Sequence, residues 1–191
     1  SPSAEGTDGA IRLALAILQE EPDKYFMPNQ FANPANVQAH YETTGREVYE
    51  QTGGRVTHFI AGMGTTGTLM GVGKRLKEYN KEIKIIGVEP TKGHRIQGLK
   101  NMSESIVPEI FDPIQLDERY IVSDEEAFDT TRMLAIKEGI FAGMSSGAAM
   151  YIAQKKSSEL REGVIVVILP DRGDRYLSTS LFTSICSKCP P

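Results

Sequence analysis

Apolar residues recur at helical spacing in several stretches of the chain. The stripe over 8–20 predicts a helix that ends before Pro22. Asn33 is predicted to cap the N-terminus of the next helix, and Pro34 is a residue favoured in the first helical turn. This helix is predicted to run to about residue 51. Further helices are predicted over 67–79, over 124–138 behind a capping box of Ser123 and Glu126, and from the small-residue turn 143–147 to about residue 160.

Short apolar runs fall between these helices and predict strands over 56–61, 83–88 and 164–169. The last run is rich in β-branched residues, which is typical of a strand buried on both faces. Residues 91–118 are predicted to be irregular, and the periodicity stops after Leu181, so 183–191 is predicted to be a tail or linker. Alternating strands and helices predict an α/β fold with three layers around a largely parallel sheet.

Composition places the chain among globular proteins, because 40% of its 191 residues are hydrophobic and 24% are charged. The net charge of −4 and the lack of a basic stripe argue against a nucleic-acid partner. The longest uncharged apolar run, 164–169, is too short to cross a membrane, and the first residues do not resemble a signal peptide. We therefore expect a cytoplasmic protein without a membrane partner.

The two cysteines, Cys186 and Cys189, both stand in the last six residues. Their position excludes a disulfide-stapled fold and a cysteine nucleophile in the body of the domain. The pair is half of a zinc-ribbon motif, and without a second pair it is more typical of an unstructured tail. His40, His58 and His94 are not at metal-ligand spacing, so we expect no metal site and structural or surface roles for the histidines.

A segment rich in glycine and threonine connects the first predicted strand to the next helix. Gly62, Gly64 and Gly67 let the backbone approach a ligand closely and take positive φ. The N–H groups of the helix N-terminus and the threonine hydroxyls then donate to an anion, which predicts a phosphate cup. Thr68 is not followed by the lysine of a nucleotide P-loop. The glycines also satisfy G-x-G-x-x-G, with Glu89 at about the distance of a ribose-binding acid, so a dinucleotide site and an ordinary turn remain alternatives.

Several longer segments resemble those of a known protein family, whereas the loop alone does not identify one. They are Gln30-Phe31-Ala32-Asn33-Pro34-Ala35-Asn36, the stretch 40–45, the loop 64–68, the stretch 139–149 and the stretch 171–179, in this order. Over residues 1–182 the sequence resembles the cysteine synthase family (O-acetylserine sulfhydrylases), the B-type more than the A-type. The resemblance implies a type II pyridoxal-phosphate (PLP) fold, like that of the tryptophan synthase β-subunit, with its N-terminal part missing. It further implies that 1–27 is a remnant of the N-terminal subdomain and 28–182 the PLP-phosphate-binding domain.

The resemblance also implies roles for particular residues. The phosphate of PLP is expected to lie against Gly64, Thr65, Thr66, Gly67 and Thr68. Ser145 is expected to bind the pyridine nitrogen, with its neighbour Ser146 as the alternative, and Gln30 to lie near the substrate carboxylate. Lys100 falls in a segment that borders the active-site mouth in the family, where a cation favours an anionic group such as that of O-phosphoserine or thiosulfate. A solvated surface lysine is the alternative.

The Schiff-base lysine of the family stands in a Ser-x-Lys-x-Arg segment that this sequence lacks. We therefore expect no catalytic residue in this chain, and no activity from the chain alone. The implied reaction is PLP-dependent β-replacement, in which O-acetylserine or O-phosphoserine and a sulfur donor give cysteine. A homodimer and a serine acetyltransferase tail are the implied protein partners. A cystathionine β-synthase-like enzyme, a dehydratase (which the segment 30–45 argues against) and a non-catalytic PLP- or peptide-binding module are the alternatives.

Asp171 and Asp174 alternate with two arginines, Arg172 and Arg175. Paired carboxylates can act as an acid and a base, but the interleaved positive charges favour a local turn of ion pairs. A position of Asp171 near the cofactor ring is the alternative.

Overall fold

The computed structural model describes residues 5–182, so the predicted tail 183–191, with Cys186 and Cys189, lies outside the described residues. Within them, the centre is a four-stranded sheet in the order β3-β2-β1-β4. Its strands are β1 (His58–Gly62), β2 (Lys84–Pro90), β3 (Glu118–Val122) and β4 (Ile165–Val167). All three pairings are parallel, which confirms the α/β fold and the largely parallel sheet predicted from the sequence.

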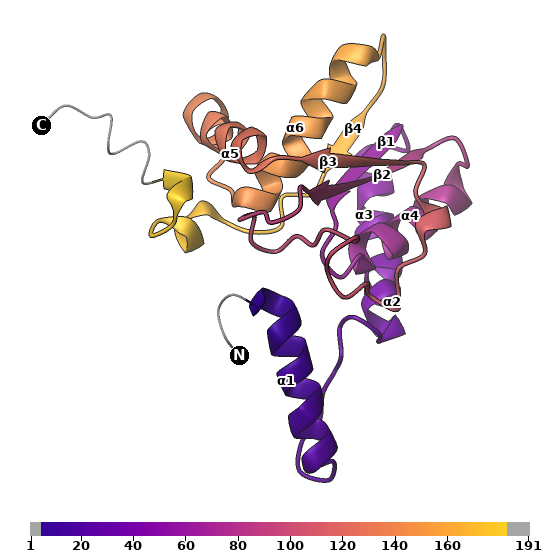
Figure 1. Ribbon diagram of the computed structural model, residues 1–191. Helices are drawn as coiled ribbons and strands as arrows, with labels where there is room; N and C mark the ends of the chain where they lie inside the picture. The colour runs from indigo at the N-terminus through magenta and orange to yellow at the C-terminus, as the bar shows by residue number, and fades with distance from the viewer. Residues whose placement is uncertain (1–4, 183–191) are drawn as a thin grey trace, which may run out of the picture.

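Helices cover both faces of this sheet (Figure 1). They are α2 (Pro34–Glu42), α3 (Thr44–Gln51) and α4 (Gly67–Tyr79) on one face, and α5 (Asp124–Glu138) and α6 (Met144–Glu159) on the other. Successive side chains of a strand point to opposite faces. In β1, Phe59 and Ala61 therefore pack into the cluster beside α4, while Ile60 packs into the cluster beside α5 and α6. The predicted three-layer arrangement is confirmed.

Local capping signals in the sequence mark three of the helix ends. The side chain of Asn33 accepts a hydrogen bond from the N–H of Ala35 at 2.9 Å and so caps α2. Ser123 and Glu126 form both hydrogen bonds of the predicted capping box at the start of α5. Gly139 ends that helix with φ 67°, a conformation that glycine adopts at little cost.

The helix predicted from Pro34 to about residue 51 is in fact two helices, with a break at Thr43 (φ −109°, ψ −83°). The Thr43 hydroxyl donates to the carbonyl of Ala39 at 2.7 Å, a local hydrogen bond that competes with helix continuation. After the break, Gly45 packs so closely against α4 that a Cβ there would lie 2.7 Å from Arg75 Cβ. The break therefore has a local hydrogen bond on one side and the packing of α3 on α4 on the other.

Two strands differ from the sequence-based expectation. The run 164–169 was expected to be buried on both faces, but β4 spans three residues, is half-buried, and forms an edge of the described sheet. Its one partner among residues 5–182 is β1, so its other edge is uncovered there. β3 begins at Glu118, inside the stretch predicted to be irregular, and its alternation of exposed and half-buried residues reflects the opposite edge of the sheet.

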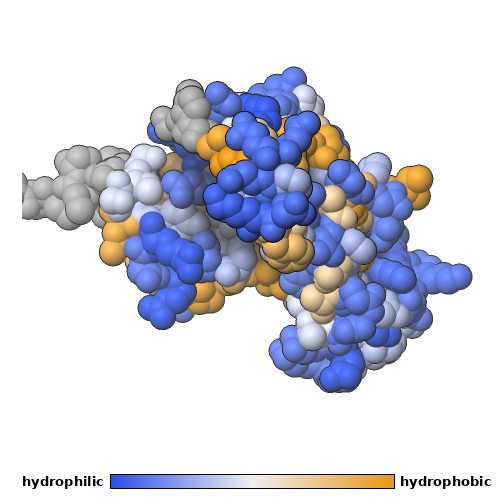
Figure 2. All heavy atoms as spheres, turned by 90° about the horizontal axis from the view of Figure 1, so that it is seen from below, coloured by the Kyte–Doolittle hydropathy of each residue, from blue (hydrophilic) through white to orange (hydrophobic). Residues whose placement is uncertain are grey.

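The first helix, α1 (Gly6–Glu20), lies outside the three layers (Figure 1). Figure 2 views the molecule from the side on which α1 projects, and shows a mostly hydrophilic face with separate hydrophobic patches. The apolar side chains of α1 that stay exposed are Leu13, Leu15 and Ile17. Among residues 5–182, no helix has the length and apolar content that a membrane span requires.

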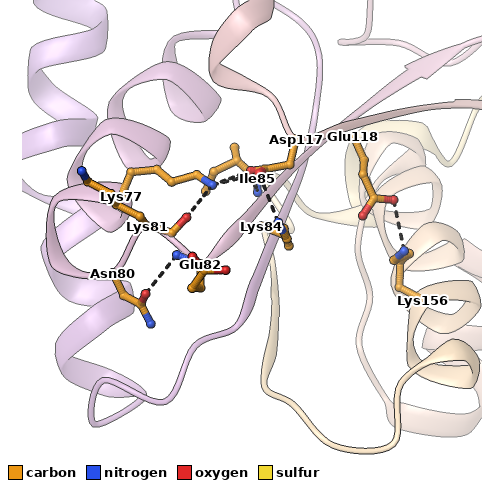
Figure 3. A network of polar contacts seen from close by, with 9 residues as sticks. All are labelled: Lys77, Asn80, Lys81, Glu82, Lys84, Ile85, Asp117, Glu118 and Lys156. Atoms are coloured by element: carbon orange, nitrogen blue, oxygen red, sulfur yellow. Dashed lines mark hydrogen bonds and ion pairs between the residues drawn. The ribbon is translucent and has the colours of Figure 1, made fainter.

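A polar network joins the start of β3 to its neighbours (Figure 3). Asp117 accepts a hydrogen bond from the N–H of Ile85 in β2 at 2.8 Å. The same carboxylate pairs with Lys77 of α4 at 2.8 Å and with Lys84 at 3.6 Å. Burial alone would raise the pKa of Asp117, but these donors outweigh it and hold the pKa below its usual value. One carboxylate therefore fixes a helix end and two strands together.

We expect Asp117→Ala to lower the free energy of unfolding by about 1–3 kcal/mol, because it leaves a backbone N–H and a lysine without their acceptor. Urea unfolding followed by circular dichroism measures this change. The matched control is Glu82→Ala, which removes a nearby exposed carboxylate and should change stability by less than about 0.5 kcal/mol. Equal stability of the two variants would contradict the role given to Asp117.

Candidate functional site

A pocket of about 490 Å³ opens where β1 and β4 end, which is where ligands bind in open α/β sheets. Three residues predicted separately from the sequence, Gln30, Lys100 and Ser145, line this pocket. The Gly-Thr loop contributes four more, namely Gly64, Thr65, Thr66 and Thr68. A larger groove of about 790 Å³ runs along the C-terminal half of α4, but no predicted site residue lines it. The smaller pocket is therefore the candidate site.

The loop between β1 and α4 offers free hydrogen-bond donors. The N–H groups of Gly64, Thr65 and Thr66 have no acceptor among residues 5–182, and they precede the first turn of α4. Orphan N–H groups and the partial positive charge of a helix N-terminus together bind an oxyanion. The cup predicted from the sequence therefore has the donors that a phosphate requires.

The loop glycines were expected to take positive φ, but Gly62, Gly64 and Gly67 do not. Thr66, not a glycine, carries φ 69° in this loop, and it is 3% exposed. A β-branched residue in this region is strained, and such strain gathers at binding sites. Gly64 instead allows a close approach, since a Cβ there would lie 2.7 Å from the carbonyl oxygen of Gly98. Threonine is not a residue type that signals positive φ in a sequence, so the sequence could not mark Thr66.

Gly67 does not line the pocket, but it makes room for Asn36 of α2. A Cβ at Gly67 would overlap the Asn36 side chain. Asn36 Nδ2 donates to the carbonyl of Gln30 at 2.8 Å and to Thr65 Oγ1 at 3.1 Å. One amide therefore joins two predicted site residues. Sequence reasoning assigned no role to Asn36, because its partner in the loop lies 29 residues away in the chain.

The side chain of His40 lies between two threonine hydroxyls, one of which belongs to the loop. Its Nδ1 lies 3.0 Å from Thr44 Oγ1 and its Nε2 lies 3.1 Å from Thr68 Oγ1. Burial lowers the pKa of His40, so the neutral imidazole is favoured and can orient the Thr68 hydroxyl. This contact agrees with the structural role expected of the histidine.

Ser145 and Ser146 differ in their access to the pocket. Ser145 lines it, near the start of α6, and is 5% exposed. Ser146 is fully buried, does not line the pocket, and its Oγ has no partner among residues 5–182. The geometry favours Ser145 over Ser146 as a ligand-binding hydroxyl.

Lys100 is 5% exposed, so the alternative of a solvated surface lysine is wrong. Its Nζ pairs with the carboxylate of Asp8 in α1 and donates to the carbonyl of Ile106 at 3.3 Å. The other oxygen of Asp8 accepts from the N–H of Ile106 at 2.7 Å. Burial alone would raise the pKa of Asp8, but the bonds from Lys100 and Ile106 outweigh it and the pKa is lowered.

The expected turn of ion pairs forms in part, without Asp171. The exposed pair Arg172–Asp174 forms at 3.4 Å, but Asp171 instead accepts a hydrogen bond from the Tyr176 hydroxyl and lines the pocket. The alternative position near a bound ring thus agrees with the geometry. The interleaved charges of the sequence concealed this partner, because tyrosine carries no charge.

Glu89 cannot serve as the ribose-binding acid of a dinucleotide site. It is 1% exposed, and its two oxygens pair with Arg119 at 2.9 Å and with the N–H of Met102 at 2.9 Å. It also does not line the pocket. Within the described part of the chain, no group of three or more His, Cys, Asp or Glu residues is placed to hold a metal ion.

Comparison with known proteins gives consistent matches. A family model described as "Pyridoxal-phosphate dependent enzyme" matches residues 2–171. The cysteine synthase of Aquifex aeolicus (strain VF5) is 48% identical over 184 residues, which cover 94% of this chain and 56% of that protein. Cysteine synthase B of Escherichia coli (strain K12) is 43% identical over 178 residues, 93% of this chain and 58% of that protein. The chain thus spans a little over half the length of these relatives.

Solved structures of other proteins also resemble this fold closely. O-acetyl serine sulfhydrylase isoform 3 of Entamoeba histolytica superposes with a TM-score of 0.82 at 37% identity, over 94% of this chain and 56% of that one. O-ureido-L-serine synthase superposes with a TM-score of 0.87 at 36% identity, over 97% of this chain and 61% of that one. The type II fold and the resemblance inferred from the sequence are confirmed.

We expect stability to fall as the pH is lowered from 7.5 to 5.5. Burial lowers the pKa of His40, and burial followed by the charge of Lys156 lowers that of His58. The unfolded chain, with histidine pKa values near about 6.5, therefore takes up protons first, and the stabilisation present above that pH is lost below it. The check is the urea midpoint at each pH for the wild type and for the double variant His40→Gln, His58→Gln. The same pH slope in both proteins would refute the assignment.

Proposed function

Since this chain belongs to the family of pyridoxal-phosphate dependent enzymes, we propose that it supplies the phosphate-binding half of a cysteine synthase-type active site. The proposed reaction is β-replacement, in which O-acetylserine or O-phosphoserine and a sulfur donor give cysteine. The observation that carries the proposal is the set of three unpaired loop N–H groups at the N-terminus of α4, inside the pocket that Ser145 also lines. The matched part covers 56% and 58% of the two cysteine synthases above, so the reaction is proposed for the whole protein.

The residues present fit PLP. The loop N–H groups and the hydroxyls of Thr65 and Thr68 would hold its phosphate, and Ser145 would face the ring nitrogen. The bound cofactor supplies an electron sink for a carbanion. Gln30 and Lys100 stand on the wall formed with α1 and would face the amino-acid substrate. The lysine that holds the cofactor covalently is proposed to lie outside residues 1–191, because the family segment that carries it is not in this sequence.

The division of the chain remains part of the proposal. We propose residues 28–182 as the phosphate-binding domain and 1–27 as part of a second subdomain, which agrees with the position of α1 outside the three layers (Figure 1). A cytoplasmic location, a homodimer and a serine acetyltransferase tail as partner rest on the sequence resemblance.

Titration of the 191-residue chain with PLP tests this proposal. We expect saturable binding, and no covalent adduct after borohydride reduction and intact mass measurement. Gly67→Ala should weaken binding about tenfold, because its Cβ would displace Asn36 and break hydrogen bonds worth about 1 kcal/mol each. Gly73→Ala is the control on the same helix: its Cβ would lie 3.2 Å from Ile85 Cγ2, away from the candidate pocket, and this variant should bind PLP like the wild type.

Each outcome of this titration is informative. No binding by the wild type would overturn the phosphate site. Specific labelling of one lysine would show that the covalent lysine lies within these 191 residues. Binding of NAD in place of PLP would restore the dinucleotide alternative.

The position of Lys100 leads to a second proposal, which concerns the substrate. The ammonium of Lys100 and the N–H of Ile106 form an anion site that Asp8 fills, at the wall of the pocket. An incoming anionic group would compete with Asp8 for these donors. We propose that the site accepts O-phosphoserine in this way.

Isothermal titration of the PLP-saturated chain compares O-phospho-L-serine with O-acetyl-L-serine. Lys100→Gln should weaken binding of the phosphorylated compound about tenfold or more, the effect of one charged hydrogen bond, and leave the acetylated one unchanged. Asp8→Asn should strengthen binding of the phosphorylated compound by removing the competitor. Lys92→Gln, at an exposed position, is the control for net charge. Equal affinities of wild type and Lys100→Gln would exclude the role.

A further inference from the structure

Thr65, Thr66 and Thr68 of the loop between β1 and α4 all line the candidate pocket, but their hydroxyl protons are held differently. Thr66 is 3% exposed, and its hydroxyl donates to the carbonyl of Thr65 at 2.6 Å, so its only proton is used within the loop. Thr65 and Thr68 are partly exposed. Whether these two hydroxyls can donate to a ligand depends on the groups behind them.

The direction of the Thr65 hydroxyl is fixed by its neighbours. Thr65 Oγ1 accepts a hydrogen bond from Asn36 Nδ2 at 3.1 Å and another from the N–H of Gly67 at 3.2 Å. Asn36 Nδ2 also donates to the carbonyl of Gln30, which can only accept, so the orientation of this amide follows from the contact. A hydroxyl oxygen has two lone pairs, and both are engaged here. The Thr65 proton has no acceptor among residues 5–182 and is left for a ligand in the pocket.

The Thr68 hydroxyl also has a partner behind it, but the direction of that hydrogen bond is open. Thr68 Oγ1 lies 3.1 Å from His40 Nε2, and His40 Nδ1 lies 3.0 Å from Thr44 Oγ1. A neutral imidazole has one donor nitrogen and one acceptor nitrogen, so this chain of groups can run in two directions. With the proton on Nδ1, Thr68 donates to His40 and has only lone pairs left for a ligand. With the proton on Nε2, Thr68 accepts from His40 and its own proton stays available.

Both of these contacts come from one face of α2, because Asn36 and His40 are four residues apart in that helix. This face lies close against α4. A Cβ at Gly67 would overlap the Asn36 side chain, and a Cβ at Gly71 would lie 2.7 Å from His40 Cβ. Gly67 and Gly71 are also four residues apart, so the two helices are in close contact over one turn. The packing therefore holds an amide and an imidazole at fixed positions behind the loop.

The chemistry of a phosphate dianion distinguishes the two directions, so this step rests on the proposed function. The oxygens of the dianion only accept hydrogen bonds, and the lone pairs of a hydroxyl repel them. Burial lowers the pKa of His40 and favours the neutral ring. We propose that His40 is a positioning residue for the phosphate of PLP: in the complex it carries its proton on Nε2, donates to Thr68 Oγ1, and so leaves the Thr68 proton to the phosphate.

Thr44 fits the same direction. When Nε2 of His40 carries the proton, Nδ1 is an acceptor, and the Thr44 hydroxyl donates to it. The Thr44 hydroxyl makes no other hydrogen bond among residues 5–182, so nothing there opposes this direction. Thr44 then donates to His40, His40 to Thr68, and Thr68 to the ligand. Asn36 prepares Thr65 in the same way but without a choice of direction, because the amide NH₂ group cannot accept.

Long-range proton–nitrogen-15 NMR of the histidine rings tests the proposal on the PLP-saturated wild type at about pH 8, above the usual histidine pKa. We expect His40 to show the Nε2–H tautomer, with Nδ1 unprotonated. The chain has three histidines, and His40→Gln identifies the signals of His40. The control is His58, which does not line the pocket and whose Nδ1 lies 2.8 Å from Thr57 Oγ1, so its signals should be the same with and without PLP. An Nδ1–H tautomer, an even mixture of the two or an imidazolium at His40 would overturn the role and leave the proposed function intact.

A double-mutant cycle on the affinity for PLP gives a second readout. Thr68→Val keeps the shape of the side chain but removes the hydroxyl, and should weaken binding about tenfold or more, the effect of one hydrogen bond to a charged group. His40→Leu should weaken binding about fivefold in the wild type and not at all in the Thr68→Val background, because its effect passes through Thr68.

The same loss from His40→Leu in both backgrounds would show a merely structural histidine and contradict the proposal. If His40→Leu does not fold, the tautomer in the wild type still decides, since that spectrum needs no variant to be stable. If the wild type does not bind PLP, the proposed function itself fails, and this inference fails with it.

Discussion

The parallel pairing of β1 with a strand on each side is the constraint on which the pocket depends. β1 lies between β2 and β4, and Phe59 and Ile60 on its two faces are fully buried. Ile60 pairs with Val167, so the two strands reach the same edge of the sheet together. The phosphate loop leaves from one strand end and the segment with Asp171 leaves from the other. Residues more than a hundred positions apart therefore share one pocket, and a shift in this register would separate them.

The sequence predicted the features whose causes are local. The helix over 67–79 was expected at its observed bounds, and the Asn33 cap and the Ser123 capping box formed as expected, because each signal acts within one turn of helix. The phosphate cup was predicted for the same reason, since a strand, a glycine-rich turn and a helix start follow one another directly. The family resemblance then predicted that Ser145 belongs to the same site as the cup. The spacing of residues alone could not have predicted this.

The remaining features were missed because long-range contacts decide them. The break at Thr43 accompanies the packing of Gly45 on Arg75, and β4 is half-buried because of its place in the sheet order. The environment of Lys100 depends on Asp8, a partner 92 residues away. Asp171 looked like half of an ion pair, since charge alternation is visible in a sequence and a tyrosine hydroxyl five residues on is a weaker signal. In each case the residue type could be read from the sequence, but the residue that it contacts in the fold could not.

The charges of the pocket explain why neutral donors hold the phosphate in the proposed site. The cation that lines the pocket, Lys100, is already matched by Asp8, and Asp171 adds a negative charge to another part of the wall. A dianion placed near Asp171 would be repelled, whereas the loop offers unpaired N–H groups and a helix dipole. In the proposed site, repulsion as well as attraction would thus orient the ligand. The same Asp8 bonds Lys100 and the N–H of Ile106, so the match of charge at this wall also attaches α1 to the body of the protein.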